Sequence, residues 1–199
     1  MEYILIIIST VLVNNIILTQ FLGICPFLGV SNKFSTAVGM SGAIIFVMAI
    51  ATVFTYLLQY YLLIPLDIGF MQTVTFIVVI ATLVQIVEII LKKVSPSLHK
   101  ALGIFLPLMA TNCAVLGTAI IVVSKEFAFG GEPHMLNLIE SVVYAVGMGL
   151  GVGVAMVLFA GIREQLELNN VPKAFKGAPI ALVTAGILAM AFMGFAGLV

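Results

Sequence analysis

Long, uninterrupted apolar stretches alternate with short polar breaks along the chain. Each stretch is near or above the roughly 20 residues that a helix needs to cross a hydrocarbon core about 30 Å thick. Membrane-spanning strands would instead show alternating segments of about ten residues, and helices satisfy their backbone hydrogen bonds internally. The pattern therefore predicts an all-α integral membrane protein with six transmembrane helices, in the ranges 3–22, 37–63, 71–91, 101–123, 138–162 and 178–199.

The composition agrees with this interpretation. Of the 199 residues, 63% are hydrophobic and 8% are charged, and the mean hydropathy is +1.30. These values exclude a soluble globular domain, because such a domain needs a charged surface. We therefore expect a single membrane domain over residues 1–199, with the lipid bilayer around it and no nucleic-acid partner.

The basic residues are distributed unevenly among the connections between these stretches. Connections on the cytoplasmic side of a membrane carry an excess of Lys and Arg. Only Lys125 lies in an even-numbered connection, whereas the first, third and fifth connections hold all the others: Lys33, Lys92, Lys93, Lys100, Arg163, Lys173 and Lys176. We therefore expect the odd-numbered connections in the cytoplasm and both termini outside.

One short motif occurs twice. "CPFLG" at 25–29 and "CAVLG" at 113–117 share Cys-x-x-Leu-Gly, and each lies in or just after the first span of a three-span half. Because each half has an odd number of spans, the halves enter the membrane from opposite sides. This predicts a 3+3 inverted repeat with halves of about 1–95 and 96–199. Three shared residues can also arise by chance in apolar sequence, where a free cysteine is commonly a small buried hydrophobe.

Helix breakers accompany both copies of the motif. Gly23 and Pro26 flank the first cysteine in a segment too long for one straight crossing, and we expect them to end a half-helix there. Cys113 lies about 12 residues, or some 18 Å, into the fourth span. Pro107 and Asn112 come just before it. Backbone broken at membrane depth needs protein or a cavity to cover it, and in inverted repeats such breaks mark the site. Broken first and fourth helices would therefore bring the two cysteines together.

The two thiols leave two kinds of chemistry open. A disulfide needs Cα atoms within about 7 Å and has little use in a cytoplasm-oriented membrane protein. Soft thiolates suit zinc or iron–sulfur clusters, which usually need four ligands, but Cys25 and Cys113 are the only cysteines in the sequence. Two further thiolates would have to come from another chain. That chain would be a second copy or, more naturally, a sister subunit with the same paired motif.

Long motifs in a fixed order give the chain a specific family resemblance. The segments "LVNN" (12–15), "FLGICPFLGVS" (21–31), "ALGIFLPLMATNCAVLG" (101–117), "VLFAGIRE" (157–164) and "TAGILAMAFMGFAGL" (184–198) resemble RnfA, a membrane-subunit family of the Rnf electron-transport complex. The E-type subunits of the sodium-translocating NADH:quinone oxidoreductase form a related family. Their first cysteine is usually followed by threonine, so Pro26 and the pair Asn14 and Asn15 favour the Rnf side.

The resemblance implies a subunit of an ion-translocating complex that passes electrons between reduced ferredoxin and NAD in the bacterial inner membrane. RnfA-like and RnfE-like subunits have opposite topologies and hold a [2Fe–2S] cluster between them. Each contributes two cysteines, which map here onto Cys25 and Cys113. Flavins, the NAD site and the other clusters belong to partners of the RnfB, RnfC, RnfD and RnfG types, so this chain alone has no complete active site.

The remaining features favour structural roles. "GMGLGVG" at 147–153 lacks dinucleotide-binding spacing and instead gives small-residue contacts for close helix packing. Glu88 lies within the third span, four residues before Lys92, which offers it an ion pair. Asn112 could cap a broken helix, line a wet cavity or donate to a cluster sulfur. Arg163, Glu164 and Glu167 are expected on a solvated cytoplasmic face, which could serve as a docking surface.

An alternative function is a cofactor-free transporter or channel. Its inverted repeat would hold a substrate between the broken helices. No clear acidic or basic residue at mid-membrane supports a charged substrate.

Overall fold

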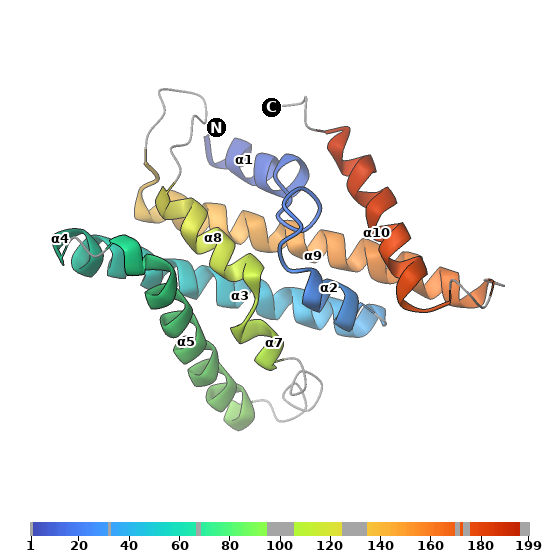
Figure 1. Ribbon diagram of the computed structural model, residues 1–199, viewed down its shortest axis with the longest axis horizontal. Helices are drawn as coiled ribbons and strands as arrows, with labels where there is room; N and C mark the ends of the chain where they lie inside the picture. The colour runs from blue at the N-terminus through green and yellow to red at the C-terminus, as the bar shows by residue number, and fades with distance from the viewer. Residues whose placement is uncertain are drawn as a thin grey trace.

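The computed structural model describes residues 2–31, 33–66, 69–94, 106–124, 135–169, 172 and 176–195. All regular structure in these ranges is helical, which confirms the all-α prediction (Figure 1). In chain order the elements are α1 (Glu2–Ile8), the π-helix η1 (Ser9–Val13), α2 (Ile24–Val30), α3 (Phe34–Leu58), the π-helix η2 (Gln59–Leu63), α4 (Ile64–Leu66), the 3₁₀-helix η3 (Gly69–Met71), α5 (Gln72–Val94), α7 (Leu106–Ala110), α8 (Cys113–Ser124), α9 (Leu138–Leu168) and α10 (Ala178–Met193).

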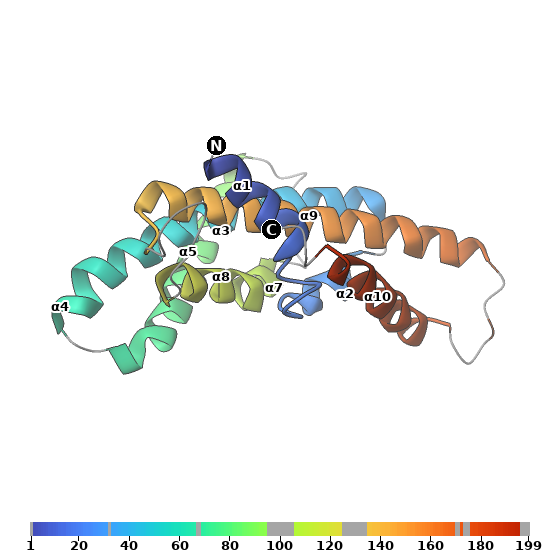
Figure 2. The same cartoon turned by 90° about the horizontal axis from the view of Figure 1, so that it is seen from above.

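Two long antiparallel helices, α3 and α9, form the centre of the molecule (Figures 1 and 2). Glycines of α9 allow them to approach closely. A Cβ added at Gly149 would lie 3.0 Å from the Cα of Ile45, and one added at Gly153 would lie 3.2 Å from the Cβ of Ser41. This contact confirms that the glycine-rich stretch packs helices together.

A second pair of glycines on α9 receives the first helical segment. A Cβ added at Gly147 would lie 3.3 Å from the Cβ of Thr10, and one added at Gly151 would lie 3.1 Å from the carbonyl oxygen of Thr10. The contacted segment is the π-helix η1, which follows α1 without a break. The four glycines therefore divide between two faces, one toward η1 and one toward α3.

Six helical stretches overlap the six predicted spans. Among the described residues, three are long and apolar enough to cross a membrane: Phe34–Leu66, Gly69–Ile90 and Leu138–Leu168. Three more are apolar but shorter: Ile4–Val13, Leu108–Ser124 and Ala178–Met193. The chain is therefore a multi-pass membrane protein. Six complete crossings remain a prediction, because the shorter stretches fall below the length of a full span.

The first and fourth helical stretches are interrupted, but Gly23, Pro26 and Pro107 do not act there as the sequence predicted. Gly23 does not end a half-helix, because it is the residue that precedes α2. Pro26 is the third residue of α2, in the first turn, where its missing N–H costs no helical hydrogen bond. Pro107 is the second residue of α7, and the interruption falls after this helix, at Thr111 and Asn112.

Candidate functional site

The first cysteine lies at the start of α2. Gly23 precedes this helix with φ +84°, a left-handed conformation that costs energy for any residue with a side chain. The position is also crowded, since an added Cβ would lie 3.0 Å from the Cβ of Ala114. Cys25, the second residue of α2, is exposed. The turn and the close approach of α2 to α8 therefore both require glycine at position 23.

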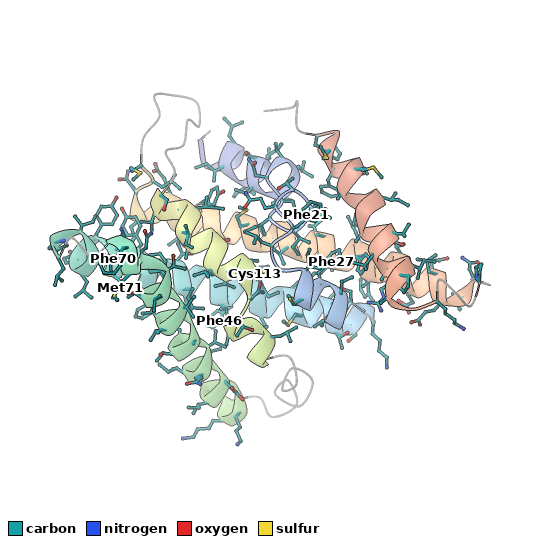
Figure 3. The ribbon with its side chains drawn as sticks, viewed as in Figure 1. Phe21, Phe27, Phe46, Phe70, Met71 and Cys113 are labelled. Carbon is teal, nitrogen blue, oxygen red and sulfur yellow. The ribbon has the colours of Figure 1, made fainter. Side chains whose placement is uncertain are left out.

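The second cysteine is the first residue of α8. Asn112 caps this helix: its carbonyl oxygen accepts the N–H of Leu116 at 3.3 Å, and its Oδ1 accepts the N–H of Ala114 at 2.9 Å. Cys113 is half-buried and lies near the middle of the molecule in Figure 3. Both thiols therefore stand in the first turn of a helix that follows a break.

The two breaks meet each other. The backbone N–H of Gly23 donates to the Sγ of Cys113, with a nitrogen–sulfur distance of 2.8 Å. The final glycine of each motif also faces the other broken helix. A Cβ added at Gly117 would lie 2.7 Å from the Cδ1 of Leu22, and one added at Gly29 would lie 4.0 Å from the Cδ2 of Leu108. The expected meeting of the broken helices is thus confirmed.

One polar atom beside this contact has no partner. Asn112 is buried, and no described residue accepts a hydrogen bond from its Nδ2. The same side chain faces Gly23, since a Cβ added there would lie 3.4 Å from its Oδ1. A buried amide without an acceptor costs about 1–3 kcal/mol. Of the three roles considered for Asn112, helix capping is confirmed. Its Nδ2 donates to no described residue and is available to an acceptor outside them.

Helix α9 holds the other end of α2. Phe27 and Phe159 are fully buried, and their rings stack with centroids 4.3 Å apart. The guanidinium carbon of Arg163 lies 5.9 Å from the centre of the Phe159 ring, and its Nη1 donates to the carbonyl oxygen of Leu28 at 2.7 Å. Arg163 was expected on a solvated face. That expectation holds only in part, because Arg163 lines a surface cavity but is half-buried, and its guanidinium contacts α2.

Asn15 links the end of the first helical segment to α9. Its Nδ2 donates to the carbonyl oxygen of Gly151 at 2.7 Å, and its Oδ1 accepts the N–H of Ile17 at 3.2 Å. Asn15 is fully buried. Further along the same link, Phe21 is the only non-glycine residue with positive φ in the described chain, at +56°. The link between η1 and α2 is therefore fixed at its start and strained near its end.

Comparison with known proteins identifies the family. Residues 3–199 match the family described as "Rnf-Nqr subunit, membrane protein". The chain belongs to the Rnf-Nqr family. It is 55% identical to a protein of Acetobacterium woodii that is named as the A subunit of the Na(+)-translocating ferredoxin:NAD(+) oxidoreductase complex, in an alignment covering 100% of this chain and 98% of the relative.

Two further relatives of this Rnf-Nqr chain are named as the A subunits of ion-translocating oxidoreductase complexes. The protein of Pseudoalteromonas translucida is 52% identical over 100% of this chain and 98% of its own length. The protein of Syntrophotalea carbinolica is 54% identical over 98% of this chain and 96% of its own length. The resemblance to RnfA is thereby confirmed along the whole chain.

The described part of this Rnf-Nqr chain offers two thiols and no complete metal site. It contains no group of three or more His, Cys, Asp or Glu side chains able to hold a metal ion. Glu88 lacks the ion pair that its spacing from Lys92 offered: both residues lie on α5, and within the described residues they form no ion pair. Cys25 and Cys113 are therefore not joined by a third His, Cys, Asp or Glu ligand among the described residues.

Proposed function

We propose that this chain is a membrane subunit of an ion-translocating ferredoxin:NAD oxidoreductase complex. In this proposal Cys25 and Cys113 supply two of the four thiolates of an intramembrane [2Fe–2S] cluster, through which electrons cross the membrane. The observation that carries the proposal is the meeting of the two cysteine-bearing breaks, where the N–H of Gly23 points at the Cys113 sulfur.

The surroundings of the thiols fit such a cluster. Thiolates bound to iron carry negative charge, and backbone N–H donors to sulfur stabilise that charge. Gly23 provides such a donor, and the two cysteines stand in first turns, where free N–H groups favour negative charge. The unpaired Nδ2 of Asn112 is a further donor beside Cys113.

The remaining two thiolates are assigned to a sister subunit of the RnfE type. Cys25 is exposed on the isolated chain, so a partner's sulfurs can be brought next to it. Each motif glycine faces the other broken segment, Gly117 toward Leu22 and Gly29 toward Leu108, and this supports a 3+3 inverted repeat with halves of about 1–95 and 96–199. A homologous partner of opposite topology would complete the site by the same arrangement.

When bound, a [2Fe–2S] cluster accepts and passes on single electrons. The residues of this chain would hold and tune it. Cys25 and Cys113 bind iron, the N–H of Gly23 stabilises charge on sulfur, and the stacked rings of Phe27 and Phe159 keep water away from α2. Flavins, the NAD site and the remaining clusters are assigned to partners of the RnfB, RnfC, RnfD and RnfG types.

The proposed orientation places both termini outside the bacterial inner membrane. Three of the basic residues assigned to the cytoplasm gather at one end of the molecule. Lys33 lines a surface cavity with Glu167, and Glu167 lines a neighbouring cavity with Arg163 and Lys176. Such clustering agrees with the excess of basic residues in cytoplasmic connections. Lys100, Lys125 and Lys173 lie outside the described residues.

The test is the iron and acid-labile sulfide content of the purified complex. We expect Cys25→Ser and Cys113→Ser each to remove the two iron atoms and two sulfides of one [2Fe–2S] cluster, while clusters of the partner subunits remain. Ser124→Ala, at the far exposed end of α8, is the matched control and should keep full iron. Unchanged iron in both cysteine variants would overturn the cluster and leave the cofactor-free transporter as the better interpretation.

A further inference from the structure

Helix α2 depends on its neighbours for its position. It has seven residues and carries Cys25 in its first turn. A helix this short is not stable on its own, so its place in the molecule is set by tertiary contacts. At its start, the contact is the hydrogen bond from Gly23 to Cys113. The contacts at its other end determine whether Cys25 is held firmly.

Side chains of two helices hold that end: Thr36 of α3 donates to the carbonyl oxygen of Val30 at 3.1 Å, and Arg163 of α9 makes a second, charged contact. Arg163 donates to the carbonyl oxygen of Leu28, one of the last four carbonyls of α2, which have no acceptor role within the helix. A cation at this end also interacts favourably with the helix dipole. Arg163 further lies over the ring of Phe159, which stacks on Phe27 of α2. One guanidinium therefore supports α2 directly and through an aromatic pair.

The charge of Arg163 has no competing partner in the described chain. Glu164 and Glu167 follow it on α9, but both are exposed and neither forms an ion pair with it. The residues that Arg163 supports, Phe27 and Leu28, follow Cys25 by two and three positions, within one helical turn. Fixing them therefore fixes the direction in which the Cys25 side chain leaves the helix.

We propose that Arg163 is a positioning residue for Cys25. It anchors α2 to α9 and thereby sets where this thiol stands relative to Cys113. The consequence for iron binding rests on the proposed function, whereas the anchoring itself does not.

The anchoring is tested in complexes that cannot hold the cluster. Val30, the last residue of α2, is buried, so a thiol at that position reacts only when α2 leaves its place. In a Cys25→Ser, Cys113→Ser background, Val30→Cys is alkylated with a maleimide and quantified by peptide mass spectrometry. We expect Arg163→Met to increase the labelling rate about tenfold or more, as for the loss of a charged hydrogen bond.

Two further variants make this measurement specific. Arg163→Lys keeps a cationic donor and should restore much of the protection. Lys176→Met removes a charge from the same surface cavity, and no hydrogen bond or ion pair joins Lys176 to α2 among the described residues, so it should leave the rate unchanged. The comparison is between Arg163→Met and the native Arg163, both in the same Cys25→Ser, Cys113→Ser, Val30→Cys background. Equal labelling rates in complexes of equal subunit composition would overturn the anchoring.

The effect on the site is then measured with both native cysteines present. We expect Arg163→Met to lower iron and labile sulfide and to alter the electron paramagnetic resonance spectrum of the reduced cluster, and Arg163→Lys to restore both. A loosened α2 with an unaltered cluster spectrum would overturn the positioning role. Iron that does not depend on Cys25 in the wild-type complex would instead overturn the proposed function, and the labelling experiment would still decide the anchoring.

Discussion

The substitution Gly23→Ala tests the turn that joins the two cysteine motifs. Alanine at φ +84° is strained by about 1–2 kcal/mol. Its Cβ would also lie 3.0 Å from the Cβ of Ala114, an atom fixed to the backbone of α8. Overpacking of this kind costs about 1–3 kcal/mol. We expect a total loss of about 2–5 kcal/mol, because α2 must move away from α8 to relieve the contact.

The two contributions can be separated by a double-mutant cycle. Ala114→Gly removes the atom that the new methyl group meets. The double variant should therefore regain the stability lost to overpacking, while the cost of backbone strain at position 23 remains. Gly39→Ala, on α3, is the matched control: an added Cβ there meets no atom within 4 Å. It replaces a helical glycine by a better helix former and should gain up to about 1 kcal/mol.

The assay is thermal unfolding of the purified complex, together with its iron and labile sulfide content. Movement of α2 withdraws the N–H of Gly23 from the Cys113 sulfur, so Gly23→Ala should lose iron as well as stability. Wild-type stability and full iron in Gly23→Ala would refute the assigned role of this turn. Failure of Ala114→Gly to recover any stability would refute the contact between α2 and α8.

Three further predictions concern the surroundings of the site. Gly151→Ala should lose about 1–3 kcal/mol in thermal unfolding, because its Cβ would lie 3.1 Å from a carbonyl oxygen of η1, whereas Gly161→Ala on the same helix meets nothing within 4 Å and should not. Asn15→Leu should lose about 2–4 kcal/mol, since it removes the hydrogen bond to the Gly151 carbonyl and leaves the buried N–H of Ile17 without an acceptor; Asn15→Asp should also lose stability, since a buried carboxylate would face that carbonyl. Asn112→Leu should lower the midpoint potential of the cluster by about 60 mV in a redox titration, if its free Nδ2 donates to a cluster sulfur, and an unchanged potential would exclude that role.

The helical architecture was predictable because lipid leaves few choices. Runs of apolar residues near the length of a span must be helices, so each predicted run contains a helical stretch. The repeated Cys-x-x-Leu-Gly also predicted that two distant segments meet, and the contact of Gly23 with Cys113 confirms it. These features could be predicted because each depends on the types of residues that lie close together in the sequence.

The residues that hold the site in place were not predictable in this way. Arg163 and Leu28 are 135 positions apart, and Asn15 and Gly151 are 136 apart. Their partners are backbone carbonyls, which every residue possesses, so no residue type signals them. Local rules were ambiguous even where they applied: glycine in a left-handed conformation can follow one helix or precede the next, and only the packing of α2 against Ala114 decides that Gly23 precedes. The break was therefore expected at the right residues, but Gly23 was expected to end a helix, and it instead directly precedes the helix that carries Cys25.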